Sequence, residues 1–228
     1  MNEVTLRVNK KLFIRDPQQT ELGQRIVKHS IELIDELGFE HFTFRKLAEQ
    51  IESAEASVYR YFENKHRLLH YLAAWYWTWL NYRIDLATSN LTDGKIRLKA
   101  AIRVITAPIV QDPALEFVNE VALHRIVVAE MEKTYLTKWV DIDNQEGLFG
   151  GFKALCEKLS SFIHDINPDY SYCNSLASTM ILATYQQMFF LLHLPSLSDL
   201  KMKERSLEPH QQLQVFIEGI AFNTIGAA

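Results

Sequence analysis

The sequence predicts an all-α protein of about nine helices, with an N-terminal three-helix helix-turn-helix domain followed by a larger helical domain. Apolar residues recur at three- and four-residue spacing along most of the chain, which is typical of amphipathic helices. Helix-capping residues stand at the ends of these segments. The alternation typical of strands is confined to residues 4–14, where it predicts an extended arm or a minor strand.

The first helix is predicted to run from Asp16 to Leu37. Asp16 is a candidate N-cap, Pro17 suits the first helical position, and Gln19 completes a capping box. Gly38 follows the last apolar residue and predicts a left-handed stop.

Three further helices complete the N-terminal third of the chain. Two are short, 44–50 capped by Thr43 and 54–60 capped by Ser53, and a long one follows the cap residue Asn64 and reaches about residue 89. Five more helices are predicted at about 93–107, 112–133, 144–166, 168–194 and 207–225. We divide the chain into a helix-turn-helix domain with an N-terminal extension, 1–66, and a larger helical domain, 67–228.

Composition and charge are those of an ordinary globular protein. The 228 residues are 48% hydrophobic and 23% charged, with a formal net charge of -4. Residues 1–70 hold 11 Lys and Arg against 11 Asp and Glu. Any affinity for nucleic acid must therefore depend on where the cations lie, because the net charge supplies little.

Cysteine usage and hydropathy predict a cytoplasmic protein without a metal or cofactor. Cys156 and Cys173 lie outside any zinc-binding or redox spacing, and the first residues lack the apolar core of a signal peptide. The apolar stretch 176–194 approaches the length of a membrane span, but Gln186 and Gln187 lie near its middle. We expect this stretch to be a helix buried against protein.

Residues 42–69 have the pattern of a helix-turn-helix. One set of positions is apolar and is expected to hold the third helix against its neighbours: Leu47, Ala48, Ile51, Val58 and Phe62. The other set is expected to face outward: Glu55, Ala56, Ser57 and Arg60. A recognition helix needs this division, because one face anchors it and the other enters the major groove.

This segment resembles the N-terminal domain of the tetracycline-repressor (TetR) family of bacterial regulators over roughly residues 20–70. The motif consists of Thr43, Leu47-Ala48, Tyr59-Arg60-Tyr61-Phe62, Lys65 and Leu68-Leu69. The family places Ala-Gly-apolar in the turn, whereas this chain has Ile51-Glu52-Ser53. If the turn needs positive φ, Glu52 carries a strain of roughly 1 kcal/mol there. The rest of the chain resembles the family only in helix number and length.

The resemblance implies roles for nine residues. Arg45 would contact phosphate or a base edge, and Thr43 would lie beside it at the start of the second helix. Glu55, Ala56 and Ser57 would read bases, through a hydrogen bond from cytosine to Glu and contact of Ala with a thymine methyl. Phosphate contacts would come from Tyr59, Tyr61 and Lys65, with Arg60 joining them if its face permits.

Each assignment has a plainer alternative. Tyr59 and Phe62 are also suited to be core aromatics, Lys65 and Arg67 to be a solvated helix start, and Glu55 to be exposed without a role. Basic residues of the N-terminal arm either reach the minor groove or belong to a solvated extension; they are Arg7, Lys10, Lys11 and Arg15.

The resemblance also implies a homodimer formed by the last two long helices, 168–194 and 207–225. Both are apolar on more than one face, which favours a dimer independently, although burial inside one subunit explains it equally. Two recognition helices about 34 Å apart match one turn of DNA, which predicts a near-palindromic operator.

Several aromatic residues are candidates to line a pocket for an unknown apolar or aromatic ligand: Trp75, Trp79, Phe117, His124 and Tyr185. Aromatic stripes of this kind are also typical of an ordinary core. The chain has no nucleophile elbow, phosphate loop, HExxH motif or metal cluster, so we expect no enzyme. The sequence thus predicts a DNA-binding regulator, a repressor released by a small ligand. The alternative is a helical dimeric scaffold without operator binding, which Glu52, Glu55 and the neutral N-terminal region favour.

Overall fold

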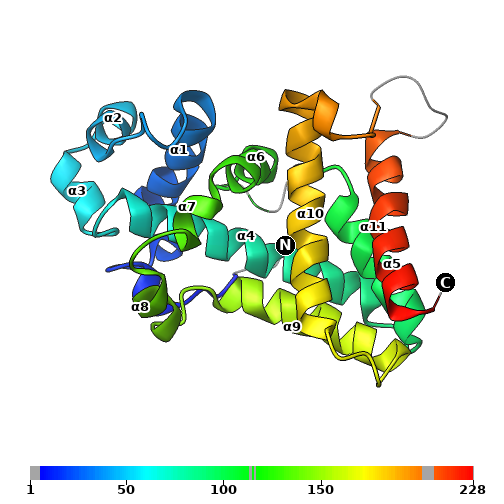
Figure 1. Cartoon of the computed structure of the whole chain (residues 1–228). Coiled ribbons are helices and arrows are strands. Elements are labelled where there is room, and N and C mark those ends of the chain that lie inside the picture. The colour runs from blue at the N-terminus through cyan, green and yellow to red at the C-terminus, as the bar shows by residue number, and fades with distance from the viewer. Residues whose placement is uncertain (1–5, 113–114, 116, 202–207, 228) are drawn as a thin grey trace. The chain divides into compact units, whose positions relative to one another are not determined.

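The computed structural model describes residues 6–112, 115, 117–201 and 208–227, and these residues form helices and connecting turns without any strand (Figure 1). The all-α prediction is confirmed. The α-helices are α1 Glu21–Leu37, α2 Phe44–Gln50, α3 Glu55–Tyr59, α4 Lys65–Thr88, α5 Gly94–Thr106, α6 Glu120–Glu130, α7 Glu132–Tyr135, α8 Val140–Gln145, α9 Gly150–Ile166, α10 Cys173–His193 and α11 Pro209–Ile225. Short 3-10 turns are η1 Lys10–Leu12, η2 Pro17–Gln19 and η3 Pro195–Leu197.

The helices form two compact units. The first contains Met1–Trp79 and Ile109–Gly151, and the second contains Leu80–Pro108 and Phe152–Ala228. The first unit therefore includes α1, α2 and α3, which we call the head, together with α6, α7 and α8. The functional division predicted after residue 66 remains a prediction.

The beginning of α1 differs from the prediction. Residues 17–19 form the 3-10 turn η2, and α1 begins after Thr20, whose hydroxyl accepts a hydrogen bond from the Gly23 amide at 3.1 Å. Asp16 caps η2 instead, and the Gln19 side chain donates to the Asp16 carboxylate, so the expected capping box is wrong. A Cβ on Gly23 would lie 2.5 Å from Pro17 Cα, so this close packing of α1 on η2 requires glycine.

The N-terminal segment also corrects an expectation. Residues 4 and 5 lie outside the described residues, and no strand is present from Leu6 onward in the part of the chain that the structure describes. Leu12 is fully buried in η1 while Ile14 is exposed, so the two do not share a face as alternation required. The Ile14 amide donates to the Tyr61 carbonyl at 2.8 Å, which ties the arm to the end of the helix-turn-helix.

The helices of the head otherwise follow the sequence closely. α2 has the predicted bounds and Thr43 accepts from the Lys46 amide at 3.2 Å, as a cap should. α1 ends at Gly38 as predicted, with φ 75°, but ψ is 156°, so this glycine is not in the left-handed helical conformation that was expected. Asn64 caps α4 through a 2.9 Å bond from the Arg67 amide. Ser53 does not cap α3, because the cap position is Ala54.

Two helices in the middle of the chain begin later than predicted. The helix expected from residue 112 begins at Glu120 instead, because Asn119 accepts a 3.0 Å bond from the Ala122 amide; Pro113 lies outside the described residues. The helix expected over 144–166 is divided into α8 and α9, and Gly147 between them has φ 75°. Positive φ ends a helix, so one predicted element becomes two.

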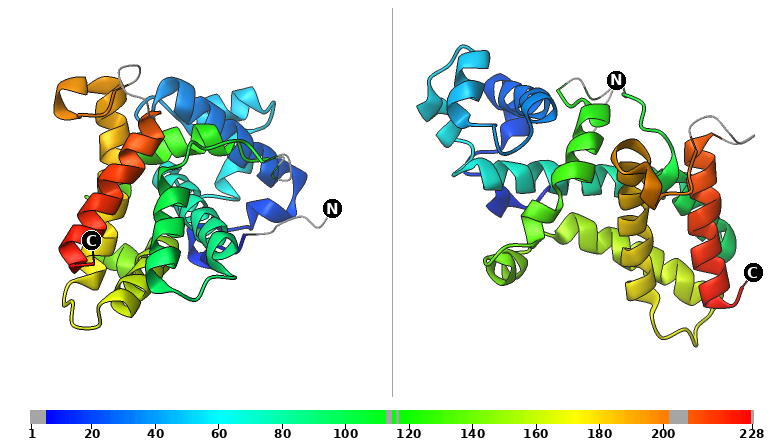
Figure 2. Two further views of the ribbon diagram at one scale, coloured as in Figure 1. Left: turned by 90° about the vertical axis from the view of Figure 1, so that its right-hand side faces the viewer. Right: turned by 45° about the horizontal axis from the view of Figure 1, so that its top comes forward.

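In the second unit, α10 and α11 lie side by side and α11 also packs on α5 (Figure 2). α10 buries Leu176, Met180, Ile181 and Tyr185, which agrees with the helix predicted there to be buried against protein. Among the described residues, no helix combines the length and apolarity that crossing a membrane requires. α11 begins with a capping box formed by Glu208 and Gln211 and ends at Gly226 in the left-handed conformation.

Candidate nucleic-acid interface

The back of the helix-turn-helix is held by apolar side chains, as predicted. Leu47, Ile51, Val58 and Phe62 are each at most 1% exposed, and Ala48 is 4% exposed. These residues hold α2 and α3 together with the start of α4, which is the anchoring half of a recognition helix.

The turn between α2 and α3 is a Schellman motif closed by an unusual residue. The Ser53 amide donates to the Ala48 carbonyl at 2.9 Å, and the Glu52 amide donates to the Glu49 carbonyl at 3.2 Å. Glu52 has φ 49°, the only positive φ at a non-glycine position among the described residues. The predicted strain at this position is therefore present. The Arg25 guanidinium of α1 donates to the Ile51 carbonyl and supports the turn from behind.

The outer face of α3 presents Glu55, Ala56, Tyr59 and Arg60 to solvent. Tyr59 is 47% exposed, and its ring packs edge-on against Phe44 with 5.0 Å between ring centroids. The ring is thus fixed by α2 while a large part of the side chain remains accessible. Exposed polar and aromatic groups on one short helix are suited to contact a DNA groove and its phosphates.

Ser57 does not face outward as predicted. It is 8% exposed, and its hydroxyl accepts a 3.0 Å hydrogen bond from Arg60 Nη2. Ser57 directly precedes the buried Val58, and its side chain is turned toward the residues that hold α3 in place. Ser57 orients Arg60, and the candidates for base contact on α3 are reduced to Glu55 and Ala56, with Arg60 beside them.

Tyr61 is also corrected by the structure. It is 2% exposed, and its hydroxyl is 2.8 Å from Thr20 Oγ1, the cap residue of α1. The Arg15 guanidinium lies over its ring at 5.5 Å. Tyr61 therefore ties the end of the helix-turn-helix to the start of α1, and its hydroxyl is not presented to a phosphate.

The Lys65 side chain forms its hydrogen bonds within the first unit. Its ammonium donates to the carbonyls of Phe39, Glu40 and Phe42 at 3.1, 3.2 and 3.3 Å. It also lies 4.7 Å from the centroid of the Phe39 ring. An ammonium has three N–H donors, and here each has a carbonyl acceptor. Lys65 thus holds the loop between α1 and α2 against the start of α4, and its contact with a phosphate remains a prediction.

The start of α2 keeps accessible groups. Thr43 is exposed, and Arg45 is exposed with a 3.1 Å ion pair to Glu49 one turn later. Lys46, which the sequence reading did not select, is exposed beside them and donates to the His41 carbonyl at 2.9 Å. Surface ion pairs of this kind are weak, so a phosphate readily replaces Glu49 as the partner of the Arg45 guanidinium.

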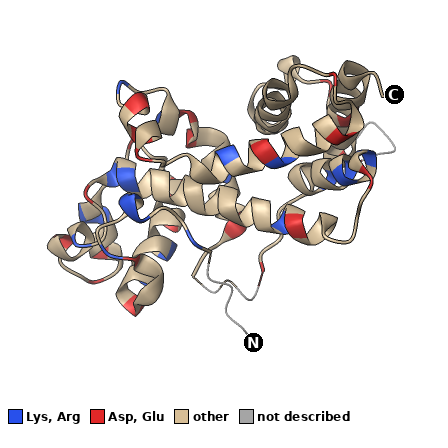
Figure 3. Ribbon diagram, turned by 90° about the horizontal axis from the view of Figure 1, so that it is seen from below, with Lys and Arg blue, Asp and Glu red and all other residues tan. Residues whose placement is uncertain are grey.

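Charge on this face is balanced. Over residues 44–60, three cations (Arg45, Lys46 and Arg60) stand with three carboxylates (Glu49, Glu52 and Glu55), and Figure 3 shows basic and acidic residues interspersed along the helices. Affinity for DNA must then come from position and hydrogen bonding, as the sequence already indicated.

Sequence reasoning missed the residues that hold the head to α6 and α7. Glu130 accepts a 3.2 Å bond from the Phe39 amide, and Lys133 is 2.7 Å from both Glu130 and Glu40. Hydrogen bonds to these two carboxylates raise the pKa of Lys133, so it is charged at neutral pH. On the same side Arg125 pairs with Asp35 through a two-pronged contact. No local pattern predicts the contacts with Asp35, Phe39 and Glu40, because these residues lie about 90 residues from their partners.

The five candidate pocket residues are divided between the units. Trp75 and Trp79 are buried and stacked at 6.5 Å, His124 is bonded to the Tyr76 hydroxyl at 2.7 Å, and Phe117 is half-buried, all in the first unit. Burial, and then the charge of Arg125, lowers the pKa of His124 to about 4. Tyr185 is buried in the second unit. A ligand pocket formed by these residues remains a prediction.

Comparison with known proteins agrees with this geometry. A family profile described as "Bacterial regulatory proteins, tetR family" matches residues 26–72. No curated protein matches the chain. A bacterial regulatory protein of the tetR family from Rhodococcus RHA1 is similar in structure, with a TM-score of 0.62 and 14% identity over 92% of this chain and 99% of that chain.

Two further solved structures are similar over most of their length. The fatty acid degradation regulator FadR from Bacillus halodurans has a TM-score of 0.59 and 13% identity, over 90% of this chain and 98% of that chain. AibR in complex with isovaleryl coenzyme A and operator DNA has a TM-score of 0.58 and 14% identity, over 87% of this chain and 98% of that chain. At such identities the likeness shows that the fold is shared.

Proposed function

The chain carries the N-terminal domain of the tetR family of bacterial regulatory proteins, and from this premise we propose that it is a transcriptional repressor that binds a near-palindromic operator as a homodimer. The observation that carries the proposal is the division of α3 into a buried back, anchored by Val58, and an accessible front of Glu55, Ala56 and Tyr59. In this proposal Glu55 and Ala56 meet base edges, while Arg45, Thr43 and Tyr59 contact phosphates.

The dimer is proposed to form through α10 and α11. Both helices bury one apolar face inside the second unit, yet they and η3 also leave apolar side chains exposed: Leu192, Leu194, Leu197, Val215 and Phe216. An exposed apolar set of this kind on neighbouring elements is typical of a protein interface. A two-fold dimer would present two copies of α3 to one duplex, which accounts for the proposed symmetry of the operator.

Release from the operator is proposed to follow binding of a small apolar or aromatic ligand. The aromatic residues Trp75 and Trp79, together with Phe117, His124 and Tyr185, are the candidates to contact it. Support comes from AibR, a protein of similar fold that was captured with both isovaleryl coenzyme A and operator DNA. The ligand of this chain depends on the residues of its own pocket.

Selection from a random duplex pool tests the operator proposal. The purified full chain is incubated with the pool at about 50 mM salt, where phosphate contacts are strong, and retained duplexes are sequenced. We expect two inverted half-sites with centres about one helical turn apart. Retention of no duplex, or of sequences without inverted symmetry, would contradict the proposal.

Arg45→Ala tests the contact map with the selected duplex. We expect weaker binding to all sequences and a salt slope reduced by about one, as for loss of one phosphate contact. Arg103→Ala is the matched control, because Arg103 is an exposed cation on α5 in the second unit. If both variants bind like the wild type, Arg45 is not at the interface.

A second candidate function is a dimeric helical scaffold that does not bind DNA. The balanced charge over residues 44–60 and the carboxylate of Glu52 beside the front of α3 favour it. The selection from the duplex pool separates the repressor from the scaffold, because a scaffold would form a dimer yet fail to retain any duplex at about 50 mM salt.

A further inference from the structure

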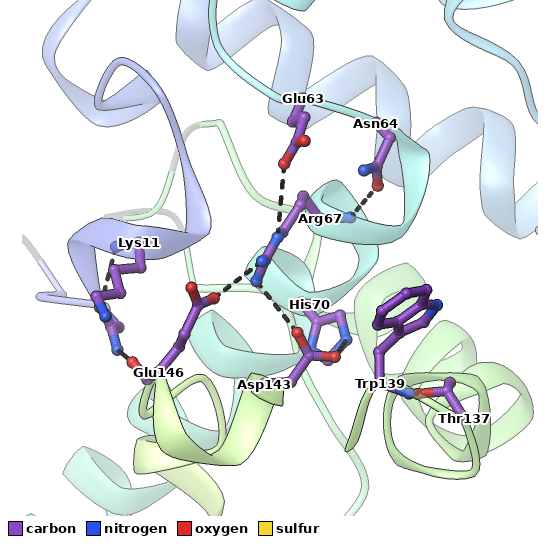
Figure 4. Close-up of polar contacts among 10 residues, drawn as sticks. Lys11, Glu63, Asn64, Arg67, His70, Thr137, Trp139, Asp143 and Glu146 are labelled. Atoms are coloured by element: carbon purple, nitrogen blue, oxygen red, sulfur yellow. Dashed lines mark hydrogen bonds and ion pairs between the residues drawn. The ribbon is translucent and has the colours of Figure 1, made fainter. Parts of the chain in front are cut away.

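A cavity of about 370 Å³ opens in the first unit between the first turns of α4 and the segment that leads into α8 (Figure 4). Its lining includes Glu63, Asn64, Arg67, His70, Trp139 and Asp143. Its volume falls in the range of small-molecule sites. None of the five aromatic and histidine residues proposed above for the sensor pocket lines this cavity.

The charge around the cavity is unbalanced. The Arg67 guanidinium is 2.9 Å from Glu146, 3.4 Å from Asp143 and 3.9 Å from Glu63, so one cation serves three carboxylates. Figure 4 shows Arg67 at the centre of this set. His70 lies 3.6 Å from Asp143, but burial lowers the pKa of His70, and it adds no positive charge near neutral pH. Among the residues that line the cavity, which also include His66, Arg67 is the one Lys or Arg against the carboxylates of Glu63 and Asp143, so the fixed charge of its Lys, Arg, Asp and Glu side chains is negative.

An exposed aromatic wall faces this negative charge. Trp139 is 67% exposed, and its backbone amide is fixed by a 3.2 Å bond to Thr137 Oγ1. Ile142 lines the cavity beside it and is 49% exposed. Trp139 and Ile142 together expose apolar surface at the cavity, and exposed apolar surface with a polar rim is typical of a binding site. Indole faces attract cations, most strongly those that water hydrates weakly.

We propose that this cavity binds an organic cation that carries an aromatic ring or a methylated ammonium group. The apolar part of the ligand lies against Trp139, and its positive charge faces Glu63 and Asp143. An anion is disfavoured because Arg67 already faces three carboxylates. Within the described residues no group of three or more His, Cys, Asp or Glu side chains is placed to hold a metal ion, so a metal does not explain the acidic charge.

The site lies at the connection between the head and α4. Glu63 and Asn64 link α3 to α4, and Asn64 also caps α4. A ligand bound here would contact the segment that fixes where α3 ends. This position makes the cavity a second binding site beside the one proposed for ligand release.

Three soluble probes of similar size test the charge preference. Isothermal titration calorimetry of the full chain without DNA would compare benzyltrimethylammonium, the neutral 2-methyl-1-phenyl-2-propanol and the anion phenylmethanesulfonate. We expect the cation to bind about tenfold more tightly than either of the others. Equal binding of the neutral probe, preference for the anion, or no binding of the cation would overturn the proposal.

Two substitutions and a control locate the site. Trp139→Leu should weaken binding of benzyltrimethylammonium about tenfold, and Glu63→Gln about threefold, while Glu63→Gln changes binding of the neutral probe little. Glu157→Gln makes the same change of charge at an exposed position on α9 in the second unit and should have no effect. Thermal unfolding checks that each variant is folded. If Trp139→Leu and Glu63→Gln both bind the cation like the wild type, the cavity is not its site. Because no DNA is present, failure here leaves the operator proposal untouched.

Discussion

The two units differ in what they do with their surfaces. In the first, charged side chains join segments that are distant in sequence, as Arg125 does with Asp35 and Arg67 with Glu146. In the second, apolar side chains on α10, η3 and α11 remain exposed, Phe216 and Leu197 among them. Long-range ion pairs occur in the second unit as well, between Arg97 and Asp165 and between Lys158 and Asp85, so what sets this unit apart is the exposed apolar set on α10, η3 and α11.

The ion pairs of the first unit fix its geometry, whereas the exposed apolar side chains of the second unit favour association with a partner. A half-exposed ion pair adds at most about 1 kcal/mol, so the pairs of the first unit do little for stability. They are directional, however, and together they fix how the head lies against α6 and α7. Exposed apolar surface behaves in the opposite way. Covering it with a partner is favourable in free energy, but the hydrophobic effect does not by itself fix the orientation of that partner. The predictions below test this contrast.

Phe216→Arg should have the largest effect. At a two-fold interface the substitution occurs twice, and it would bury two charges without partners. We expect the dimer dissociation constant to rise by about 100-fold or more, measured by sedimentation equilibrium. Affinity for the selected operator should fall with it.

The control for that variant is Leu136→Arg in the first unit. Leu136 is 70% exposed, so it also places arginine at an exposed leucine, but away from α10 and α11. It should leave the dimer unchanged. A dimer that survives Phe216→Arg would mean that the exposed apolar face of the second unit is not the interface.

Lys65→Met should be the most damaging loss of a charge in the first unit. Met keeps the length of the side chain but leaves the carbonyls of Phe39, Glu40 and Phe42 without their donor. We expect the free energy of unfolding in urea to fall by about 2 kcal/mol. Lys46→Met is the matched control, since Lys46 is exposed and donates to one carbonyl, and its effect should stay within about 0.5 kcal/mol. Equal effects of the two would refute the role given to Lys65.

His124 predicts a pH dependence within the first unit. Its pKa is lowered to about 4 in the folded chain, so between that value and its ordinary pKa near 6.5 the unfolded chain binds a proton that the folded chain does not. Stability is therefore fully present above about pH 6.5 and declines as the pH falls toward 4. The wild type should lose about 1–3 kcal/mol more than His124→Gln over this range in urea unfolding. Parallel curves for the two proteins would contradict the assignment.

Most of the side chains that the sequence placed wrongly have partners far away in the chain, although the capping box at Asp16 and the cap at Ser53 were local errors. The bounds of α2 and the cap at Asn64 depend on neighbours within five residues, and both were predicted. The carbonyl acceptors of Lys65 were not predicted because they lie 23 to 26 residues earlier, and a lysine at a helix start looks solvated in any local pattern. Tyr61 was misassigned for the same reason, since Thr20 is 41 residues away.

The contacts to α6 join residues that are even further apart in the sequence. Glu130 and Phe39 are 91 residues apart, and nothing near either residue indicates the other. Ser57 is a different kind of error. Its side chain lies between the inward and outward faces of a five-residue helix, where helical spacing cannot say which side it takes.

Glu52→Gly should have the smallest effect, and it tests whether the turn is constrained by conformation or by charge. Glycine adopts φ near 49° without steric conflict, while it also loses more freedom on folding, so the free energy of unfolding should rise by about 0.5–1 kcal/mol. Glu52→Gln removes the charge and keeps the strain, so its stability should match the wild type. Both variants remove a carboxylate beside α3 and should bind the operator more tightly at low salt. If Glu52→Gln alone reproduces the gain in stability, repulsion among the carboxylates of the head, not its backbone, is what limits this turn.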